Sequence, residues 1–292
     1  MKEQFRTNRI RPERQSMIDA VNIILQDYHS QGYKLTLRQL YYQLVAQDTI
    51  PNNTKEYSRL SQTCVIGRMN GLIDWDMIED RIRIPYLEYY ANSPQDAIED
   101  ILRQYKRDRQ EGQPKHIEIW TEKDAVSNIL KRISKKFHVR LMINRGYSSC
   151  SAMYQTYNRF YNIDKEQVIL YVGDHDPSGL DMLRDIQERL YEFGALNFKL
   201  IPVALTMSQI NQLKPPPNPT KISDPRAKWY INKFGNTSWE LDALSPKTLE
   251  TVIKVAVISC LDISQYNNIV KQENKDKTKL EDIIKRLKGG LL

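Results

Sequence analysis

The chain has 292 residues, and 43 lysines and arginines against 36 aspartates and glutamates give a net charge of +7. This length suffices for two domains of ordinary size, and the basic surplus is suggestive of a nucleic acid partner. No span is apolar enough for a membrane, the amino terminus has no signal-peptide core, and Cys64, Cys150 and Cys260 lack metal-ligand spacing. These features argue against a membrane span and a zinc site and favour a reducing, cytoplasmic location.

Residues 36–45 have the apolar spacing of an amphipathic helix. Tyr42 lies off the apolar stripe and follows Arg38 by one helical turn. The phenol and the guanidinium are therefore expected to meet on the polar face of this helix, where a neighbouring cation favours the phenolate.

A second helix is predicted from about Thr54 to Asn70, and Gly71 then opens a possible wing over 72–85. Two helices joined by a tight turn and followed by a hairpin are typical of a winged helix-turn-helix, which binds DNA. The second helix is expected to carry three basic residues outward, namely Lys55, Arg59 and Arg68. We therefore expect an amino-terminal DNA-binding domain over 1–112, which ends at a polar seam near 111–114.

Strands and helices alternate from residue 116 to residue 205. Such alternation implies right-handed crossovers and a parallel sheet with flanking helices, which is an α/β fold. The predicted strands cover 116–121, 139–143, 168–172 and 198–205. We therefore assign 115–292 to an α/β domain with a helical carboxyl-terminal extension.

Two carboxylates, Asp174 and Asp176, directly follow the apolar strand 168–172. In an extended segment they point the same way, and two close anions repel unless a proton or a cation lies between them. Magnesium is the natural occupant, although an aspartate at this position is also a common helix cap. Glu122 follows the strand 116–121, and ligands of parallel sheets bind beyond the carboxyl ends of the strands. All three carboxylates are therefore expected at one edge of the sheet.

Three segments together resemble the Toprim domain, in the version found in the A subunit of topoisomerase VI and its relatives. These are Glu122-Lys123-Asp124-Ala125-Val126, Arg145-Gly146-Tyr147 and Asp174-His175-Asp176-Pro177-Ser178-Gly179. The resemblance implies that Glu122, Asp174 and Asp176 hold Mg²⁺, or Mn²⁺ in its place, for phosphodiester chemistry. It also makes Asp181 a weaker candidate, as a ligand of a second ion, although Asp181 is equally explained as an acid of the first turn of the following helix.

The amino-terminal third extends the resemblance, because Arg38 and Tyr42 match an Arg-x-x-Tyr-Tyr signature whose second tyrosine attacks DNA. Relatives carry a second basic residue where this chain has Leu37, and a basic residue after a Gly-x-Pro turn where it has 146–148. These departures leave the ion site intact. They leave open whether Tyr42 attacks the phosphate or only contacts nucleic acid while water attacks. The family also implies a homodimer, in which each tyrosine completes the partner's ion site, and a separate ATPase subunit for strand passage.

The combined expectation is magnesium-dependent DNA strand cleavage at a Toprim site, by hydrolysis or by transesterification through Tyr42. One alternative is a DNA-binding protein that holds an ion without cleaving. Another is a Toprim nuclease that cuts structured RNA. The acidic and apolar segment 239–244 follows the sheet, and the sequence leaves its role open between packing, a supporting contact and an extra ligand.

Overall fold

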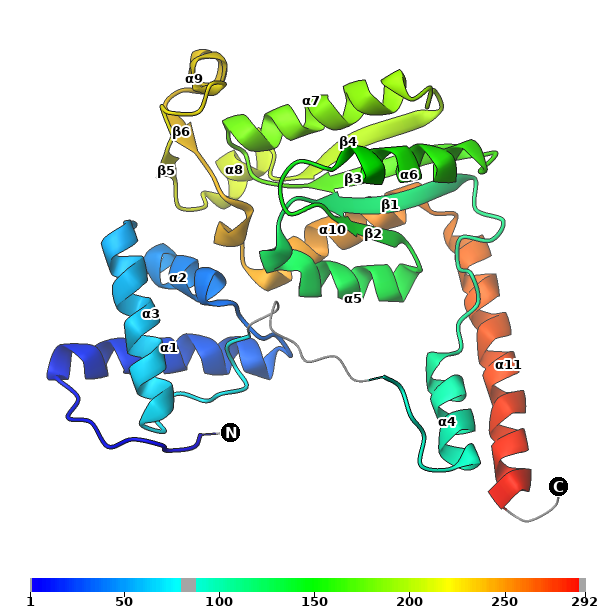
Figure 1. Ribbon diagram of the computed structural model, residues 1–292, viewed down its shortest axis with the longest axis horizontal. Coiled ribbons are helices and arrows are strands. Elements are labelled where there is room, and N and C mark those ends of the chain that lie inside the picture. Colours follow the sequence, from blue (N-terminus) through cyan, green and yellow to red (C-terminus); the bar gives the residue numbers. More distant parts are fainter. Residues whose placement is uncertain (1, 80–87, 289–292) are drawn as a thin grey trace.

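The computed structural model describes residues 2–79 and 88–288 (Figure 1). Three helices at the amino terminus pack on one another around a core of their own, which includes Ile18, Leu40 and Leu60. They are α1 (Pro12–Ser30), α2 (Leu37–Ala46) and α3 (Thr54–Met69). Helix α2 begins as its sequence predicts, because the side chains of Thr36 and Gln39 form a reciprocal capping box.

The segment after α3 differs from the predicted wing. Within the described part of the wing, residues 72–79 form turns and no β-hairpin, and Ile78 makes an isolated parallel bridge with Leu35. The Arg68 guanidinium donates to the carbonyl oxygens of Trp75 and Ile78 and so fixes this turn against α3. Residues 80–85 of the predicted wing lie outside the described residues.

The second part of the molecule is built on a sheet of four parallel strands in the order β2-β1-β3-β4, which confirms the predicted α/β fold. The strands are β1 (Lys115–Thr121), β2 (Arg140–Ile143), β3 (Glu166–Val172) and β4 (Phe198–Ala204). The first and last residues of each strand lie within two positions of the predicted ones. Helices cover both faces of the sheet, so its strands are buried on both sides. Such strands have nearly continuous apolar sequences, which is why short apolar runs predict them.

Alternate residues of the central strands enter two separate cores. Ile117 and Ile119 of β1 pack with α5 (Ser127–Phe137) and α10 (Pro246–Cys260) on one face. Trp120 packs with α6 (Cys150–Tyr161) and α7 (Pro177–Glu192) on the other. Figure 1 shows these helix pairs on opposite sides of the sheet. Alternate side chains of a strand point to opposite faces of the sheet, so each strand packs against helices on both faces.

The chain beyond β4 returns to the carboxyl edge of the sheet. It passes through α8 (Met207–Leu213), β5 (Asn218–Pro219), α9 (Ala227–Phe234), β6 (Thr237–Ser238) and the 3-10 turn η2 (Leu241–Ala243). Strands β5 and β6 pair antiparallel. His175 and Trp239 exchange two backbone hydrogen bonds of 2.9 and 3.0 Å. These bonds attach the segment after β6 to the loop that follows β3.

A helical arm extends from the other end of the sheet (Figure 1). Helix α4 (Pro94–Gln104) lies along the carboxyl-terminal helix α11 (Ile263–Lys288). Arg109, which follows α4, forms a buried ion pair with Glu273 at 3.0 Å. The stretch from α4 to Arg109, which was predicted to belong to the amino-terminal domain, thus packs with the carboxyl-terminal helix.

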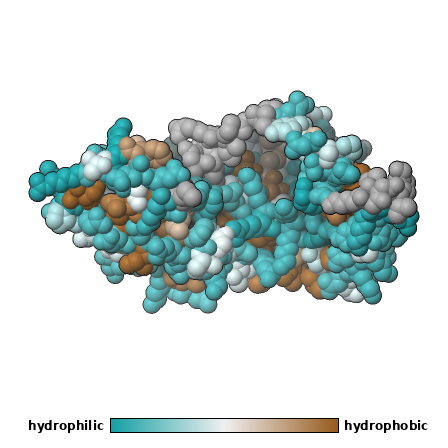
Figure 2. Space-filling view, turned by 90° about the horizontal axis from the view of Figure 1, so that it is seen from below, coloured by the Kyte–Doolittle hydropathy of each residue, from teal (hydrophilic) through white to brown (hydrophobic). Residues whose placement is uncertain are grey.

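The exterior is largely polar. Figure 2 shows a mostly hydrophilic face on which hydrophobic side chains occur in small groups. Within the described residues, no helix combines the length and the apolar character that crossing a membrane requires.

Candidate active site

The carboxyl ends of β1 and β3 bring Glu122 and Asp174 together, as the sequence predicts. The two strands are neighbours, with Thr121 paired to Val172, so the residues that follow them leave the sheet side by side. The backbone N–H of Asp174 donates to Glu122 Oε1 at 2.9 Å. The sequence predicted that both residues lie at this edge of the sheet, and the pairing of β1 with β3 makes them neighbours.

Glu122 occupies a tight position under the loop that follows β3. Its Oε2 atom accepts a hydrogen bond of 2.7 Å from the hydroxyl of Tyr171. A Cβ atom on Gly173 would lie 2.5 Å from the same oxygen, so only glycine leaves room for this carboxylate. Burial raises the pKa of Glu122, while the bonds from Tyr171 and Asp174 oppose the rise.

Asp174 is held on both of its oxygens. Oδ1 accepts from the backbone N–H of Leu241 at 2.7 Å, and Oδ2 lies 2.9 Å from Nζ of Lys123. Burial, together with the neighbouring carboxylates of Glu122 and Asp242, raises the pKa of Asp174 to about 7, although Lys123 opposes the rise. The charged form of Asp174 is thus disfavoured at this edge of the sheet.

Lys123 is an element of the site that sequence reasoning missed. Besides Asp174, its ammonium group contacts Glu240 at 3.0 Å and Asp242 at 3.3 Å. Attraction to these three carboxylates raises the pKa of Lys123 above its usual value, against the effect of burial. A lysine in the middle of three acids acts here as an internal counter-ion.

Glu240 and Asp242 were also missed as site residues, because the sequence left the role of 239–244 open. The backbone pairing of Trp239 with His175 and the turn η2 direct both carboxylates toward Asp174. Their spacing of two residues, the same as that of Asp174 and Asp176, was the available signal. Asp242 Oδ1 is buried and has no hydrogen-bond partner within the described part of the chain.

Arg38 connects the amino-terminal helices to this acidic group. Its guanidinium forms an ion pair with Glu240, with Nε at 3.0 Å, and reaches Asp242 Oδ2 at 3.2 Å. The pairs span more than two hundred residues of sequence. The prediction that Arg38 belongs to the site is therefore consistent with its position, although its partners here are carboxylates.

Asp176 has the capping role that the sequence left open as an alternative. Its Oδ1 atom accepts from the backbone N–H of Gly179 at 2.6 Å, at the start of α7. The carboxylate also lines a cavity of about 740 Å³ between the amino-terminal helices and the carboxyl edge of the sheet. Asp176 can thus cap the helix with one oxygen and face the cavity.

Asp181, the candidate ligand of a second ion, already has three polar partners in the structure. The carboxylate accepts from the hydroxyl of Tyr147 and forms ion pairs with Arg184 at 2.7 Å and Arg226 at 3.2 Å. Burial raises the pKa of Asp181, but these three partners outweigh it and lower the pKa to about 2. Two arginines already balance its charge, which leaves little attraction for a metal ion.

Tyr42 is not on an exposed polar face, contrary to the sequence expectation. Its side chain is 3% exposed and belongs to the amino-terminal core. The phenol oxygen accepts from Asn218 Nδ2 at 3.0 Å, and the Arg38 guanidinium lies 6.0 Å from the ring centre. Burial and the charge of Glu240 outweigh Asn218 and Arg38 and raise the pKa of Tyr42 to about 12. Arg38 thus favours the phenolate, as the sequence predicts, but burial and Glu240 outweigh its effect on the pKa.

The same 740 Å³ cavity is nevertheless lined by four residues discussed above, namely Tyr42, Arg38, Asp176 and Glu240. The predicted tyrosine and one of the predicted metal ligands are therefore brought together within a single chain.

The three predicted DNA-binding residues separate into two groups. Lys55 and Arg59 are exposed on α3, and Arg59 pairs with Glu56 at 3.2 Å. Arg68 is turned toward the segment 72–79, where its guanidinium lies 5.3 Å from the ring centre of Trp75. The prediction that Arg68 projects outward is wrong, because it fixes that turn.

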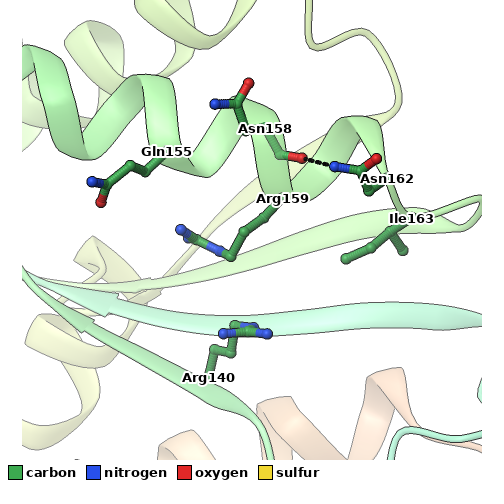
Figure 3. Close-up of a pocket in the computed structure, with 6 residues that line it drawn as sticks. All are labelled: Arg140, Gln155, Asn158, Arg159, Asn162 and Ile163. Carbon is green, nitrogen blue, oxygen red and sulfur yellow. Dashed lines mark hydrogen bonds between the residues drawn. The ribbon is translucent and has the colours of Figure 1, made fainter.

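A second cavity, of about 550 Å³, lies between α6 and the edge strand β2 (Figure 3). Figure 3 shows Arg159 on the helix and Arg140 on the strand, on either side of this space. Glu118 of β1 accepts from Arg159, which lines this cavity, at 3.1 and 3.0 Å, and from Trp120 at 2.9 Å. Glu118 thus binds partners on one sheet face, away from the acidic edge.

The acidic group is oxygen-rich but holds an ammonium ion at its centre. Among the described residues, no set of three or more His, Cys, Asp and Glu side chains is arranged to hold a metal ion. The donor set still suits a hard divalent cation in kind, since it offers carboxylate oxygens and includes Asp242 Oδ1, which accepts no hydrogen bond from the described residues. Binding on Asp174 Oδ2 would require Lys123 to turn away from that oxygen.

The sequence matches no protein-family model, and comparison with curated proteins finds no match.

Proposed function

We propose that the protein is a magnesium-dependent nuclease of the Toprim type that cuts DNA and resembles the A subunit of topoisomerase VI, with an amino-terminal domain of winged-helix type. One observation carries the proposal. Five carboxylates from three separate segments gather beyond the ends of two adjacent parallel strands, and their cationic partners are Lys123 and Arg38. The carboxylates are Glu122, Asp174, Asp176, Glu240 and Asp242.

Such an accumulation of charge contributes little to folding. The carboxylates outnumber their two cationic partners. Burial raises the pKa values of Glu122 and Asp174, and repulsion from neighbouring carboxylates adds to the rise at Asp174, so holding these groups ionised costs free energy. Perturbed acids at the ligand-binding edge of a parallel sheet are typical of functional sites. In this proposal Glu122, Asp174 and Asp176 hold the ion, and Glu240 and Asp242 support it.

Magnesium bound there supplies neutralising charge for the phosphate and for the leaving oxygen. The protein's own cations have a related role. Lys123 and Arg38 would exchange carboxylate partners for phosphate oxygens once the acids are engaged, and would hold the strand against the edge of the sheet. Water is the favoured nucleophile, because the pKa of Tyr42 is raised to about 12.

The proposal does not require a second protomer to complete the site. In the family that the chain resembles, each tyrosine serves the partner's ion site. Here Tyr42 lines a cavity with Asp176 of its own chain. A homodimer and a separate ATPase subunit therefore remain expectations from the resemblance, and neither is needed for strand cleavage.

We expect the purified chain to nick or linearise supercoiled DNA in Mg²⁺ or Mn²⁺ and to lose this activity in a chelator. The test compares supercoiled DNA with folded RNA, each with metal and with chelator, and includes the Asp174→Ala, Asp176→Ala double variant. Full cleavage by the double variant would refute the Toprim assignment. Cleavage of RNA alone would favour the structured-RNA alternative. Tight DNA binding without cleavage would favour a binding protein.

The exposed residues Lys55 and Arg59 provide a separate test of DNA contact. Replacing each with alanine is expected to reduce the slope of log affinity against log salt concentration by about one, since each loses one phosphate contact. Arg68→Ala should leave the slope unchanged and lower the melting temperature, because its guanidinium fixes the turn 72–79. Fluorescence anisotropy at several salt concentrations measures the slopes. Equal slopes for wild type and the Lys55, Arg59 double variant would mean that α3 does not face DNA.

A further inference from the structure

The cavity beside the acidic edge has the size and lining of a nucleotide site. We propose that it takes one unpaired nucleotide, so that the protein acts on single-stranded or locally opened nucleic acid in preference to intact duplex. This inference rests on the proposed nuclease function and specifies its substrate. The base would enter between the amino-terminal helices and β5, while the phosphate would remain near Asp176 and Glu240.

One wall of the cavity is aromatic. Tyr41, Tyr42 and Tyr57 all line it. Tyr41 meets each of the other two rings edge to face, with centroids 5.2 Å apart. Tyr42 is buried by its neighbours, whereas Tyr57 is partly exposed at the start of α3. Aromatic rings are the usual stacking partners of unpaired bases, and they tolerate any base because every base has a π-face.

Amide groups lie beside these tyrosines. Asn52 Nδ2 donates to Asn218 Oδ1 at 2.6 Å, and Asn218 Nδ2 donates to the Tyr42 hydroxyl at 3.0 Å. A primary amide has two N–H donors and two lone pairs on its oxygen. Asn218 therefore retains capacity for one further donated and one further accepted bond. A donor and an acceptor side by side are what the hydrogen-bonding edge of a base requires.

The remaining lining suits the sugar and phosphate. Lys221, Ser178 and Ser223 line the cavity on the side of the α/β domain, and Arg38 lines it on the side of α2. Ammonium, guanidinium and hydroxyl groups are common partners of phosphate oxygens. Base-binding and phosphate-binding groups thus share one cavity with Asp176 and Glu240, which connects it to the proposed cleavage site.

The size of the cavity favours an unpaired nucleotide. Its volume of about 740 Å³ lies in the range of pockets that hold small ligands. A base in a duplex is stacked and paired, so it would have to leave the helix to enter. That extrusion costs energy for a paired base and little for an unpaired one. The cavity is therefore expected to bind an unpaired nucleotide in preference to a nucleotide that is paired in a duplex.

The experiment compares cleavage of a single strand, a duplex with one unpaired nucleotide and the fully paired duplex, in DNA and in RNA. We expect the two substrates with unpaired nucleotides to be cut at least about tenfold faster than the paired duplex. Binding of single strands in chelator supplies a readout that does not depend on activity. Tyr57→Ala should weaken that binding about tenfold, while Tyr57→Phe retains the ring and the affinity. Tyr161→Ala, at a tyrosine that is 78% exposed on α6, is the matched control and should bind as wild type.

Equal cleavage of paired and unpaired substrates, with single-strand binding unchanged in Tyr57→Ala, would overturn the inference and leave the nuclease proposal standing. If no substrate is cut, the nuclease proposal fails, and the binding measurements in chelator still decide the inference. Should Tyr57→Ala fail to fold, Asn218→Ala probes the same cavity through its amide lining, and unchanged binding by that variant overturns the inference. Comparison of the DNA and RNA arms identifies the preferred sugar.

Discussion

Asp174→Asn is expected to abolish metal-dependent cleavage and to raise the melting temperature at pH 8. The pKa of Asp174 is raised from 3.8 to about 7 in the folded protein. Protonation of Asp174 therefore contributes stability that is fully present below pH ~4 and is lost as the pH rises through ~7. At pH 8 the wild type carries the whole cost of the charged group, at most about 4 kcal/mol, and asparagine removes it.

The pH dependence separates this effect from an ordinary stabilising substitution. The gain in melting temperature should be largest at pH 8 and should shrink toward pH 5, where wild-type Asp174 is mostly protonated. Asp48→Asn is the matched control, because Asp48 is exposed and its positive φ of 52° suits asparagine. That control should leave activity and melting temperature unchanged. A lower melting temperature for Asp174→Asn at every pH would mean that the ion pair with Lys123 is structural.

The sheet and half of the acidic site were predictable from local patterns. Apolar runs predicted four strands, and their alternation with helices predicted a parallel sheet, which places Glu122 and Asp174 at the same edge. That argument needs only one general property of α/β folds, that consecutive strands point the same way.

The other half of the site depends on long-range packing. Lys123 contacts Glu240 and Asp242, more than a hundred positions along the chain. From the sequence, a lysine that follows a glutamate is expected at the solvent-exposed surface, because most lysines lie there. Its burial follows from the path of the chain after β6, which the pairing of His175 with Trp239 and the hydrogen bond from Leu241 to Asp174 fix.

Tyr42 was misplaced for the same reason. Its helix has a single apolar stripe, so a sequence argument leaves the opposite face in water. That face is instead covered by Asn218 and Glu240 from the α/β domain, and the phenol is buried at the boundary between the two parts. The apolar period of a helix predicts which face packs in the core of its own domain. It does not predict that a second domain packs on the polar face.

Tyr42→Phe is therefore expected to retain cleavage within about threefold of wild type and to form no covalent protein–DNA product. With a pKa of about 12, roughly one Tyr42 in ten thousand is ionised at pH 8. The substitution removes the acceptor of Asn218 and should cost about 1 kcal/mol of folding stability.

Denaturant quenching of reactions on end-labelled DNA, followed by gel separation, detects any adduct. Tyr41→Phe is the matched control, because the neighbouring hydroxyl bonds to Asn52 at 2.9 Å. A trapped adduct at a DNA 5′ end that disappears only in Tyr42→Phe would show that water is not the nucleophile. The resting cavity would then have to rearrange to release the phenol from Asn218 and transfer its proton before attack.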